Sequence, residues 1–160
     1  MLDIFTVSFF GHREISHFQE IEQKLETLIY DLLKHHEYVD FLVGRNGEFD
    51  QMVSSTILRV RKRMGLSNCS LILVLPYETA EFRDNEESFR AYYDEIEVCQ
   101  SSCQAHYKSA IQIRNREMVD RSDLVVFCVE RKSGGAYQTM RYAEKQNSDC
   151  LNIYENYIII

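Results

Sequence analysis

Short apolar runs alternate with longer amphipathic stretches along most of this sequence. The clearest runs span residues 4–10, 38–43, 70–75 and 124–129, and they are rich in β-branched and aromatic side chains. Between them, apolar residues recur every three or four positions, which places them on one face of a helix. Strands that alternate with helices in this way favour a mostly parallel sheet covered by helices. We therefore predict an α/β fold, a three-layer α/β/α Rossmann-like sandwich with a sheet of about five strands.

The amphipathic stretches predict four helices, each of which starts soon after a strand ends. The first follows Ser16, which forms a capping box with Gln19. Its apolar face is expected to consist of Ile21, Leu25, Leu28, Ile29, Leu32 and Leu33. The other three helices are expected near 50–64, 105–121 and 135–146, with a last strand at 150–154.

The charge of the chain is unevenly distributed. Its 160 residues contain 18 Lys and Arg and 25 Asp and Glu, a net charge of −7, which argues against a protein that coats a nucleic-acid duplex. Residues 78–97 alone contain eight acidic side chains and two arginines. We interpret this stretch as an acidic insert with a short helix around 86–93 and a small strand near 96–98. The sequence has one proline and no low-complexity linker, so we expect residues 1–160 to form one domain.

Membrane, disulfide and metal signals are weak in this sequence. No apolar run approaches the roughly 18 residues of a membrane-spanning helix, and the start of the chain lacks a basic leader. Five cysteines are an odd number for a domain of a size that needs no disulfides, so we expect reduced thiols and a cytoplasmic protein. Cys99, Cys103 and His106 lack a fourth zinc ligand, so no metal site is predicted.

Glycines gather where the predicted strands give way to helices. They are Gly11, Gly44, Gly47, Gly134 and Gly135. Ligands of such folds bind at the carboxyl ends of the strands, where glycine admits a close approach and helix N-termini attract anions. A turn alone explains any one of these glycines, whereas several at one edge favour a binding site. Residues 133–139 contain neither GK[ST] nor GxGxxG, which argues against ATP hydrolysis and hydride transfer.

Several charged residues lie close to these glycines. Arg13, Arg45 and Arg114 are candidates to contact phosphate, because a guanidinium group grips it in two places. Asp50 is a candidate for ribose binding. Glu48, Asp50 and His12 are candidates for acid–base catalysis, although both acids also suit the start of a helix.

Five motifs in chain order carry a resemblance to a known family. They are FFGHRE at 9–14, FLVGRNGEFD at 41–50, LILVLPY at 71–77, IRNREMVDRSDLVV at 113–126 and SGGAYQTMRYAEK at 133–145. Together they resemble the SLOG superfamily of Rossmann-like proteins, in particular its YpsA-like branch. The resemblance implies a pocket for a nucleotide or a nucleotide-derived ligand. Its implied lining is Gly11, His12, Arg13, Gly44, Arg45, Gly47, Asp50, Pro76, Tyr77, Arg114, Asn115, Ser133, Gly134, Gly135 and Thr139. The family also makes a homodimer plausible, in which the apolar residues 157–160 would pack at the interface or extend the sheet.

One departure from the family pattern bears on catalysis. LOG enzymes, which cleave phosphoribosyl bonds, carry PGGxGTxxE, whereas here Ser133 replaces the proline and Arg141 or Tyr142 replaces the glutamate. We therefore favour a binding protein over an enzyme. We expect a sensor or sequestering module for a small phosphate-bearing nucleotide, with no certain cofactor, no duplex nucleic acid and no membrane as partners. Two alternatives stay open: an N-glycosidic nucleotide hydrolase that uses Glu48 or Asp50 with His12, and a protein-interaction module that uses residues 78–97.

Overall fold

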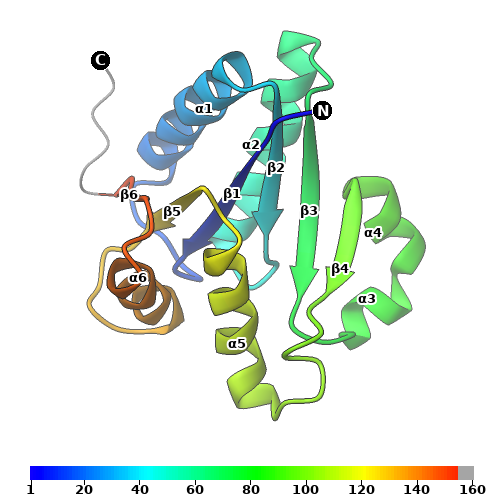
Figure 1. Cartoon of the computed structure of the whole chain (residues 1–160), viewed down its shortest axis with the longest axis vertical. Helices are drawn as coiled ribbons and strands as arrows, with labels where there is room; N and C mark the ends of the chain where they lie inside the picture. Colours follow the sequence, from blue (N-terminus) through cyan, green and yellow to red (C-terminus); the bar gives the residue numbers. More distant parts are fainter. Residues whose placement is uncertain (155–160) are drawn as a thin grey trace.

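A computed structural model describes residues 1–154, and within them six parallel strands form one sheet in the order β4-β3-β2-β1-β5-β6. The strands are β1 (Ile4–Gly11), β2 (Tyr38–Val43), β3 (Cys69–Leu75), β4 (Glu95–Val98), β5 (Leu124–Cys128) and β6 (Cys150–Asn152). The helices are α1 (Phe18–His35), α2 (Glu48–Met64), α3 (Ala80–Asp84), α4 (Glu86–Tyr92), α5 (Tyr107–Asp120) and α6 (Gly135–Lys145). Figure 1 shows them around the sheet, with α1 and α2 on one face and α5 and α6 on the other. The expected Rossmann-like three-layer sandwich is confirmed.

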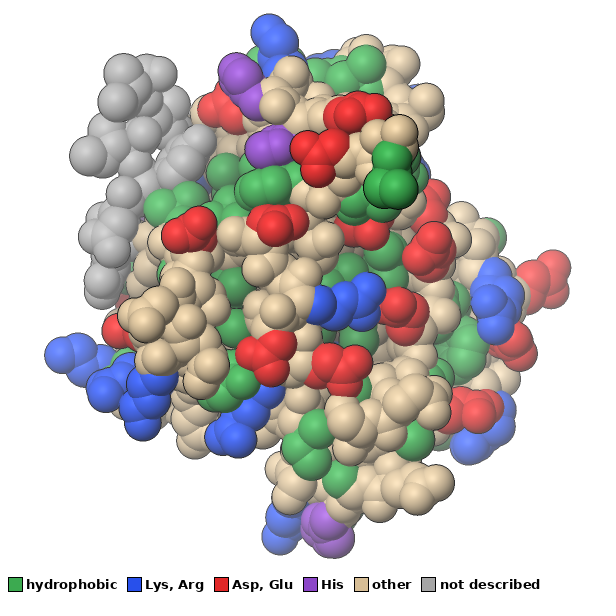
Figure 2. All heavy atoms as spheres, viewed as in Figure 1, with side chains coloured by type: hydrophobic (Ala, Val, Ile, Leu, Met, Phe, Trp, Pro, Cys, Tyr) green, Lys and Arg blue, Asp and Glu red, His purple; other side chains and the backbone are tan. Residues whose placement is uncertain are grey.

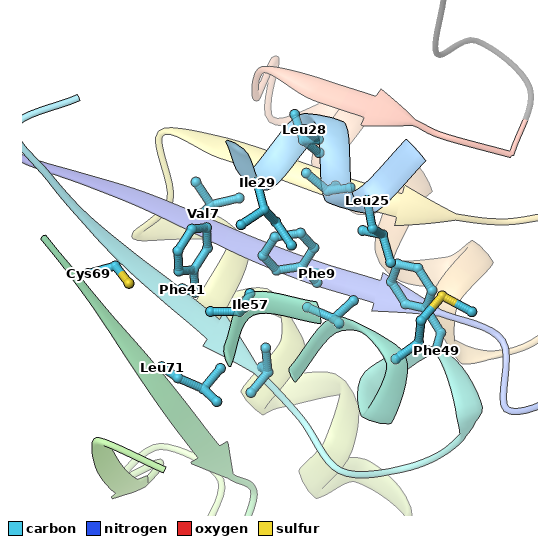
Figure 3. Close-up of a cluster of buried hydrophobic side chains, with 14 of the residues drawn as sticks. Val7, Phe9, Leu25, Leu28, Ile29, Phe41, Phe49, Ile57, Cys69 and Leu71 are labelled. Carbon is cyan, nitrogen blue, oxygen red and sulfur yellow. The ribbon is translucent and has the colours of Figure 1, made fainter. Parts of the chain in front are cut away.

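Two apolar clusters, one on each face of the sheet, hold the layers together. The larger lies between the sheet and helices α1 and α2, and Figure 3 shows Phe9, Phe41 and Phe49 within it. The smaller joins the other face to α5 and α6. Every residue of β3 is buried, because helices cover both faces of a central parallel strand. All six apolar residues predicted to form the inner face of the first helix are buried, as expected.

Two local predictions were incomplete. The sheet contains a sixth strand because the small strand suggested near 96–98 does form, as β4. Its side chains are exposed or half-buried, so it lacks the continuous apolar run that marks the other strands. Helix α3 was not predicted; its first turn is capped by Thr79, whose Oγ1 accepts the Phe82 N–H at 3.1 Å.

The capping box predicted for the first helix is wrong. His17 precedes α1 with a left-handed backbone (φ 56°) and gives no side-chain cap. Ser16 Oγ instead donates to Glu130 Oε2 at 2.8 Å, so this hydroxyl connects the start of α1 to the segment after β5.

Other predictions concern membranes, thiols, metals and the end of the chain. In the part of the chain that the structure describes, no helix has the length and apolar character needed to cross a membrane. All five cysteines are free thiols. No group of three His, Cys, Asp or Glu side chains within residues 1–154 is placed to hold a metal ion. The roles considered for residues 157–160 lie outside the described residues.

Candidate functional site

A cavity of about 520 Å³ opens at the carboxyl edge of the sheet, which we call the central pocket. Helices α2, α5 and α6 all contribute to its wall, together with the ends of β1 and β2. Nine of the residues predicted to line a ligand pocket do so: Gly11, His12, Arg13, Gly44, Asp50, Arg114, Asn115, Gly134 and Gly135. Loops far apart in the sequence therefore converge at one site.

Three exposed cations surround the central pocket: Arg13 after β1, Lys108 in the first turn of α5, and Arg131 after β5. Of these three, only Arg13 was predicted from the sequence. Arg131 follows a strand end as Arg13 does, so the same rule could have found it. Lys108 gave no comparable signal, because only the packing of α5 against the sheet brings it to this edge.

The inner wall of the pocket pairs a buried cation with an acid. Arg114 is 2% exposed, and its Nη1 donates to the Val74 carbonyl at 2.7 Å. Burial lowers the pKa of the Arg114 guanidinium, an effect that the Asp50 carboxylate opposes. Burial raises the pKa of Asp50, while a hydrogen bond from the Asn46 N–H (2.8 Å) and the charge of Arg114 act in the opposite direction. These two charges offset each other, so the net positive charge of the pocket lies at its rim.

A chain of hydrogen bonds connects Arg114 to the start of α6. Arg114 Nε donates to Asn115 Oδ1 at 2.8 Å, and Asn115 Nδ2 donates to Thr139 Oγ1 at 3.1 Å. The Thr139 hydroxyl donates to the Gly135 carbonyl at 3.0 Å. Thr139 is fully buried, so its predicted ligand contact is corrected to a positioning role. Asn115 lines the pocket and also belongs to this chain.

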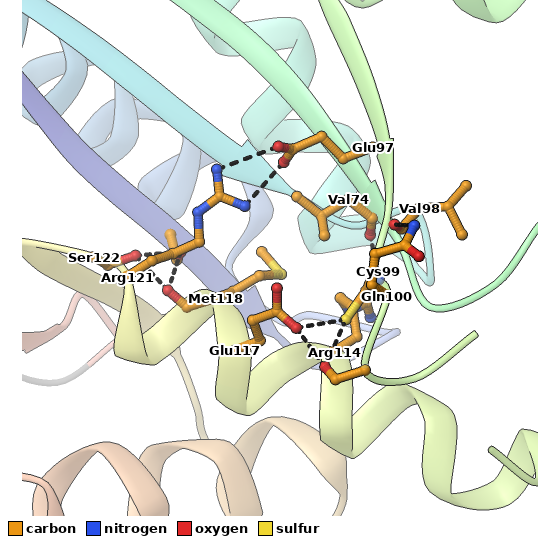
Figure 4. A network of polar contacts seen from close by, with 12 residues as sticks. Val74, Glu97, Val98, Cys99, Gln100, Arg114, Glu117, Met118, Arg121 and Ser122 are labelled. Carbon is orange, nitrogen blue, oxygen red and sulfur yellow. Dashed lines mark hydrogen bonds and ion pairs between the residues drawn. The ribbon is translucent and has the colours of Figure 1, made fainter. Parts of the chain in front are cut away.

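Polar contacts fix the C-terminal end of helix α5 to the sheet and to the segment after β4 (Figure 4). Arg121, directly after the helix, pairs with Glu97 of β4 at 2.9 Å. In the last turn of the helix, the Glu117 carboxylate accepts from Cys99 Sγ at 2.9 Å and from the Ser101 hydroxyl. These contacts hold the helix that carries Lys108 and Arg114 in register with the strand ends.

At two of the predicted site glycines, close packing leaves no room for a Cβ atom. A Cβ on Gly11 would lie 2.4 Å from ring atoms of Phe49, and one on Gly47 would lie 2.4 Å from the Arg13 Cα. Gly47 lines neither cavity of the structure described here. At Gly134 there is room for a Cβ, since no atom lies within 4 Å of where it would be. Here the backbone requires glycine, because residues with a side chain rarely adopt its φ of 90°. It precedes α6, whose first turn has no side-chain cap among the described residues and lines the pocket with Gly135 and Ala136. The first N–H groups of an α-helix have no partner within the helix and can bind an anion.

Five other predicted residues lie away from the central pocket. Arg45 is the main correction: its side chain turns to Glu81 of the acidic insert and to the Tyr93 hydroxyl (3.0 Å). Glu48 lines the same side cavity as Arg45, and its carboxylate accepts the Ile15 N–H at 3.0 Å. Pro76, Tyr77 and Ser133 line neither cavity. Pro76 is buried, and its carbonyl accepts the Ser102 hydroxyl at 2.6 Å.

His12 lies inside the pocket wall as a hydrogen-bond acceptor. It is 6% exposed, and its Nε2 accepts the Arg131 N–H at 3.1 Å. Burial is the main reason that the pKa of His12 is lowered, and the charge of Arg131 adds to the effect. The neutral ring thus fixes the backbone of the residue that carries one of the rim cations.

Basic residues gather around this edge despite the acidity of the whole chain. Residues 105–116 and 131–145 contain seven of the 18 Lys and Arg residues and one of the 25 acidic residues. Figure 2 shows Lys and Arg side chains clustered at the lower left, where Figure 1 places α6, while acidic side chains extend across the middle and right. Among the described residues, the lining of the pocket itself contains four Lys or Arg side chains (Arg13, Lys108, Arg114 and Arg131) and one acid, Asp50.

The fold of this chain is similar to that of two proteins of known structure. No protein-family model matches the chain, and no curated protein matches it. A structure that addresses the single-stranded DNA binding mode of DNA processing protein A from Helicobacter pylori is similar, with a TM-score of 0.63 and 18% identity, over 91% of this chain and 63% of that one. DNA processing protein A (DprA) from Streptococcus pneumoniae is also similar, with a TM-score of 0.65 and 17% identity, over 92% of this chain and 49% of that one.

The present chain thus spans 63% of the length of the first protein and 49% of the length of the second. At this identity the likeness shows the fold alone. The likeness supports the expected Rossmann-like fold, whereas membership of the SLOG superfamily stays a prediction from the five sequence motifs.

The expected function needs correction. We expected a sensor for a small phosphate-bearing nucleotide, but the similar structures are DNA-processing proteins, one of which binds single-stranded DNA. That expectation relied on the family resemblance and on the glycines at the strand ends, which indicate a phosphate site but not the molecule that carries the phosphate.

Proposed function

We propose that this chain binds single-stranded DNA, with the phosphate backbone seated at the central pocket. The observation that carries the proposal is the convergence of Arg13, Lys108 and Arg131 with the uncapped start of α6 on one concave site. Cations and free backbone N–H groups at a helix start are the groups that bind phosphate. The similarity to a protein that binds single-stranded DNA supports the same proposal.

The shape of the site favours a single strand over a duplex. A cavity of about 520 Å³ is concave, and a flexible single strand can bend to place one phosphate inside it. A duplex carries its phosphates on a convex, stiff surface. Single-strand binders combine a positive groove with aromatic rings on which bases stack. Tyr107 offers such a ring, because it is 61% exposed and directly precedes Lys108.

Fluorescence anisotropy with a labelled oligothymidine of about 12 nucleotides tests the proposal. Three phosphate contacts predict that log K falls with log salt concentration with a slope of about −2, because each contact to a single strand contributes about −0.7. Arg13→Ala and Lys108→Ala should each weaken binding and make the slope shallower by about 0.7.

Lys62→Ala is the matched control for these variants. Lys62 is exposed in the last turn of α2, about 20 Å along that helix from its start at the pocket. The control should bind as the unmodified protein does. Absence of binding, equal affinity for a duplex of the same length, or an equal loss in Lys62→Ala would each refute the proposal.

Two finer assignments are part of the same proposal. We assign residues 1–160 to one SLOG-type domain, and we place it in the YpsA-like branch on the five motifs found in the sequence. A single cooperative urea-unfolding transition, with the same midpoint by tyrosine fluorescence and by circular dichroism, would support the single-domain assignment.

A further inference from the structure

A second and larger cavity, of about 800 Å³, lies between α2 and the α3–α4 insert, and we call it the lateral groove. Aromatic rings form much of its wall: Tyr92 and Tyr93 at the end of α4, Phe89 within α4, and Phe18 at the start of α1. Phe18 and Tyr92 are 46% and 39% exposed, so two large rings present free surface to this groove. Flat aromatic ligands stack on rings of this kind.

The charges of the lateral groove exclude phosphate. Glu48 and Glu81 line it together with a single cation, Arg45. Arg45 is already engaged, because it pairs with Glu81, donates to the Tyr93 hydroxyl and lies over the Phe89 ring at 4.6 Å. An anion entering here would meet two carboxylates and no free cation among the lining residues described. The groove therefore suits a neutral aromatic group with polar edges.

One polar atom of the groove wall lacks a partner. Ser54 lines the groove, is 2% exposed, and its Oγ makes no hydrogen bond within residues 1–154. A buried hydroxyl left unsatisfied costs free energy, and native structures contain few of them. A ligand edge that reached Ser54 would supply the missing hydrogen bond. Gln51 and Asn85 add amide groups that can bond the edges of the same ligand.

The lateral groove adjoins the central pocket. Gly44 and Asn46 line the central pocket, whereas Arg45 between them lines the groove, so one short loop after β2 separates the two cavities. The Cα atoms of these three residues span at most about 7 Å. A strand whose phosphate occupies the pocket therefore has a neighbouring base within reach of the groove.

We propose that the lateral groove binds one unstacked base of the single-stranded DNA held at the central pocket, with Tyr92 as the stacking surface and Ser54 as a hydrogen-bond partner of the base edge. The inference rests on the proposed function, because the backbone contacts at the pocket bring the base to the groove. It adds a site that recognises the base to a site that binds the backbone.

The experiment compares two labelled strands of about 12 nucleotides, oligothymidine and an all-abasic strand with the same backbone. Unmodified protein should bind oligothymidine about 5- to 150-fold more tightly, since stacking of one base is worth about that factor. Tyr92→Ala should remove most of this advantage and leave the affinity for the abasic strand unchanged. Tyr30→Ala is the matched control, because Tyr30 is 43% exposed on α1 and about 18 Å along that helix from Phe18.

Ser54→Ala gives a second and independent measurement. Because the hydroxyl has no partner in the free protein, this variant should unfold at an equal or higher denaturant concentration than the unmodified protein. It should nevertheless bind oligothymidine several-fold more weakly, with no change for the abasic strand. A purely structural role for Ser54 predicts lower stability and an equal loss for both strands.

The outcomes separate the two proposals. Equal affinity of the unmodified protein for both strands overturns the base site and leaves the backbone site intact. A preference for bases that survives in Tyr92→Ala but disappears in Tyr107→Ala places the base at Tyr107 and also overturns it. Failure to bind either strand refutes the proposed function itself.

Discussion

Gly11→Ala tests the packing that closes the floor of the site. Gly11 ends β1, and an added Cβ would lie 2.4 Å from Cγ and Cδ2 of Phe49 and 2.7 Å from its Cβ. Phe49 is fully buried in the second residue of α2, so its ring has no free space to enter. Overpacking of this kind costs about 1–3 kcal/mol. In a chain of this size that lowers the melting temperature by about 3–10 °C.

Urea denaturation, combined with a double-mutant cycle, measures the effect. In a Phe49→Leu background the smaller side chain can rotate away, so the added cost of Gly11→Ala should fall below about 1 kcal/mol. Gly135→Ala is the control, because the nearest atom to its Cβ is the flexible end of Gln112, at 3.2 Å. That variant should change stability by less than about 0.5 kcal/mol. A Gly11→Ala protein as stable as the unmodified one, or an undiminished cost in the Phe49→Leu background, would refute the packing argument.

Two further predictions follow from the titratable groups. Burial lowers the pKa of His12 below 6.5, so at lower pH the unfolded chain binds more protons than the folded protein. The free energy of unfolding should therefore fall as the pH drops from 6.5 towards the folded-state pKa of His12, and it should be constant above 6.5 as far as this group is concerned. His12→Gln should show a shallower loss between about pH 7 and 5 in urea titrations; identical pH profiles would contradict this. Cys128 is 1% exposed, and burial raises the pKa of its thiol to about 12, whereas Cys150 is exposed. Iodoacetamide should therefore modify Cys150 in the native protein and Cys128 only after unfolding, as mass spectrometry can show. Equal rates at both thiols would be inconsistent with the structure.

The sequence predicted the order of strands and helices well because a buried parallel strand needs an unbroken apolar run. Cys69–Leu75 is buried at every position, and its run of leucine, isoleucine and valine could hardly be anything else. At Glu95–Val98 the same rule gave a weak signal, because this edge strand has no fully buried residue. The capping box failed for a different reason: the Ser16 hydroxyl bonds Glu130, a partner 114 residues away that no local pattern can reveal.

The site was predicted only in part, because the sequence indicates where a residue lies along the sheet but not which way its side chain points. Residues that directly follow strands, such as Gly11 and Arg13, must lie at the carboxyl edge of a parallel sheet wherever their side chains point. The orientation of a side chain depends on tertiary partners. Arg45 follows β2 as Arg13 follows β1, yet Glu81 and Tyr93 turn it into the lateral groove. The separation of the two residues in the sequence, 36 positions from Arg45 to Glu81, hides this contact.

The acidic insert that contains Glu81 also explains why the net charge of the chain says little about the charge of the central pocket. Among the described residues, none from 78–97 lines the central pocket, although this insert contains eight of the 25 acidic side chains. A DNA phosphate at the pocket would therefore contact Arg13, Lys108 and Arg131 and none of the carboxylates of the insert. The insert affects the site through geometry: Glu81 fixes Arg45 away from the rim, and α4 supplies the aromatic wall that separates a site for bases from a site for phosphates.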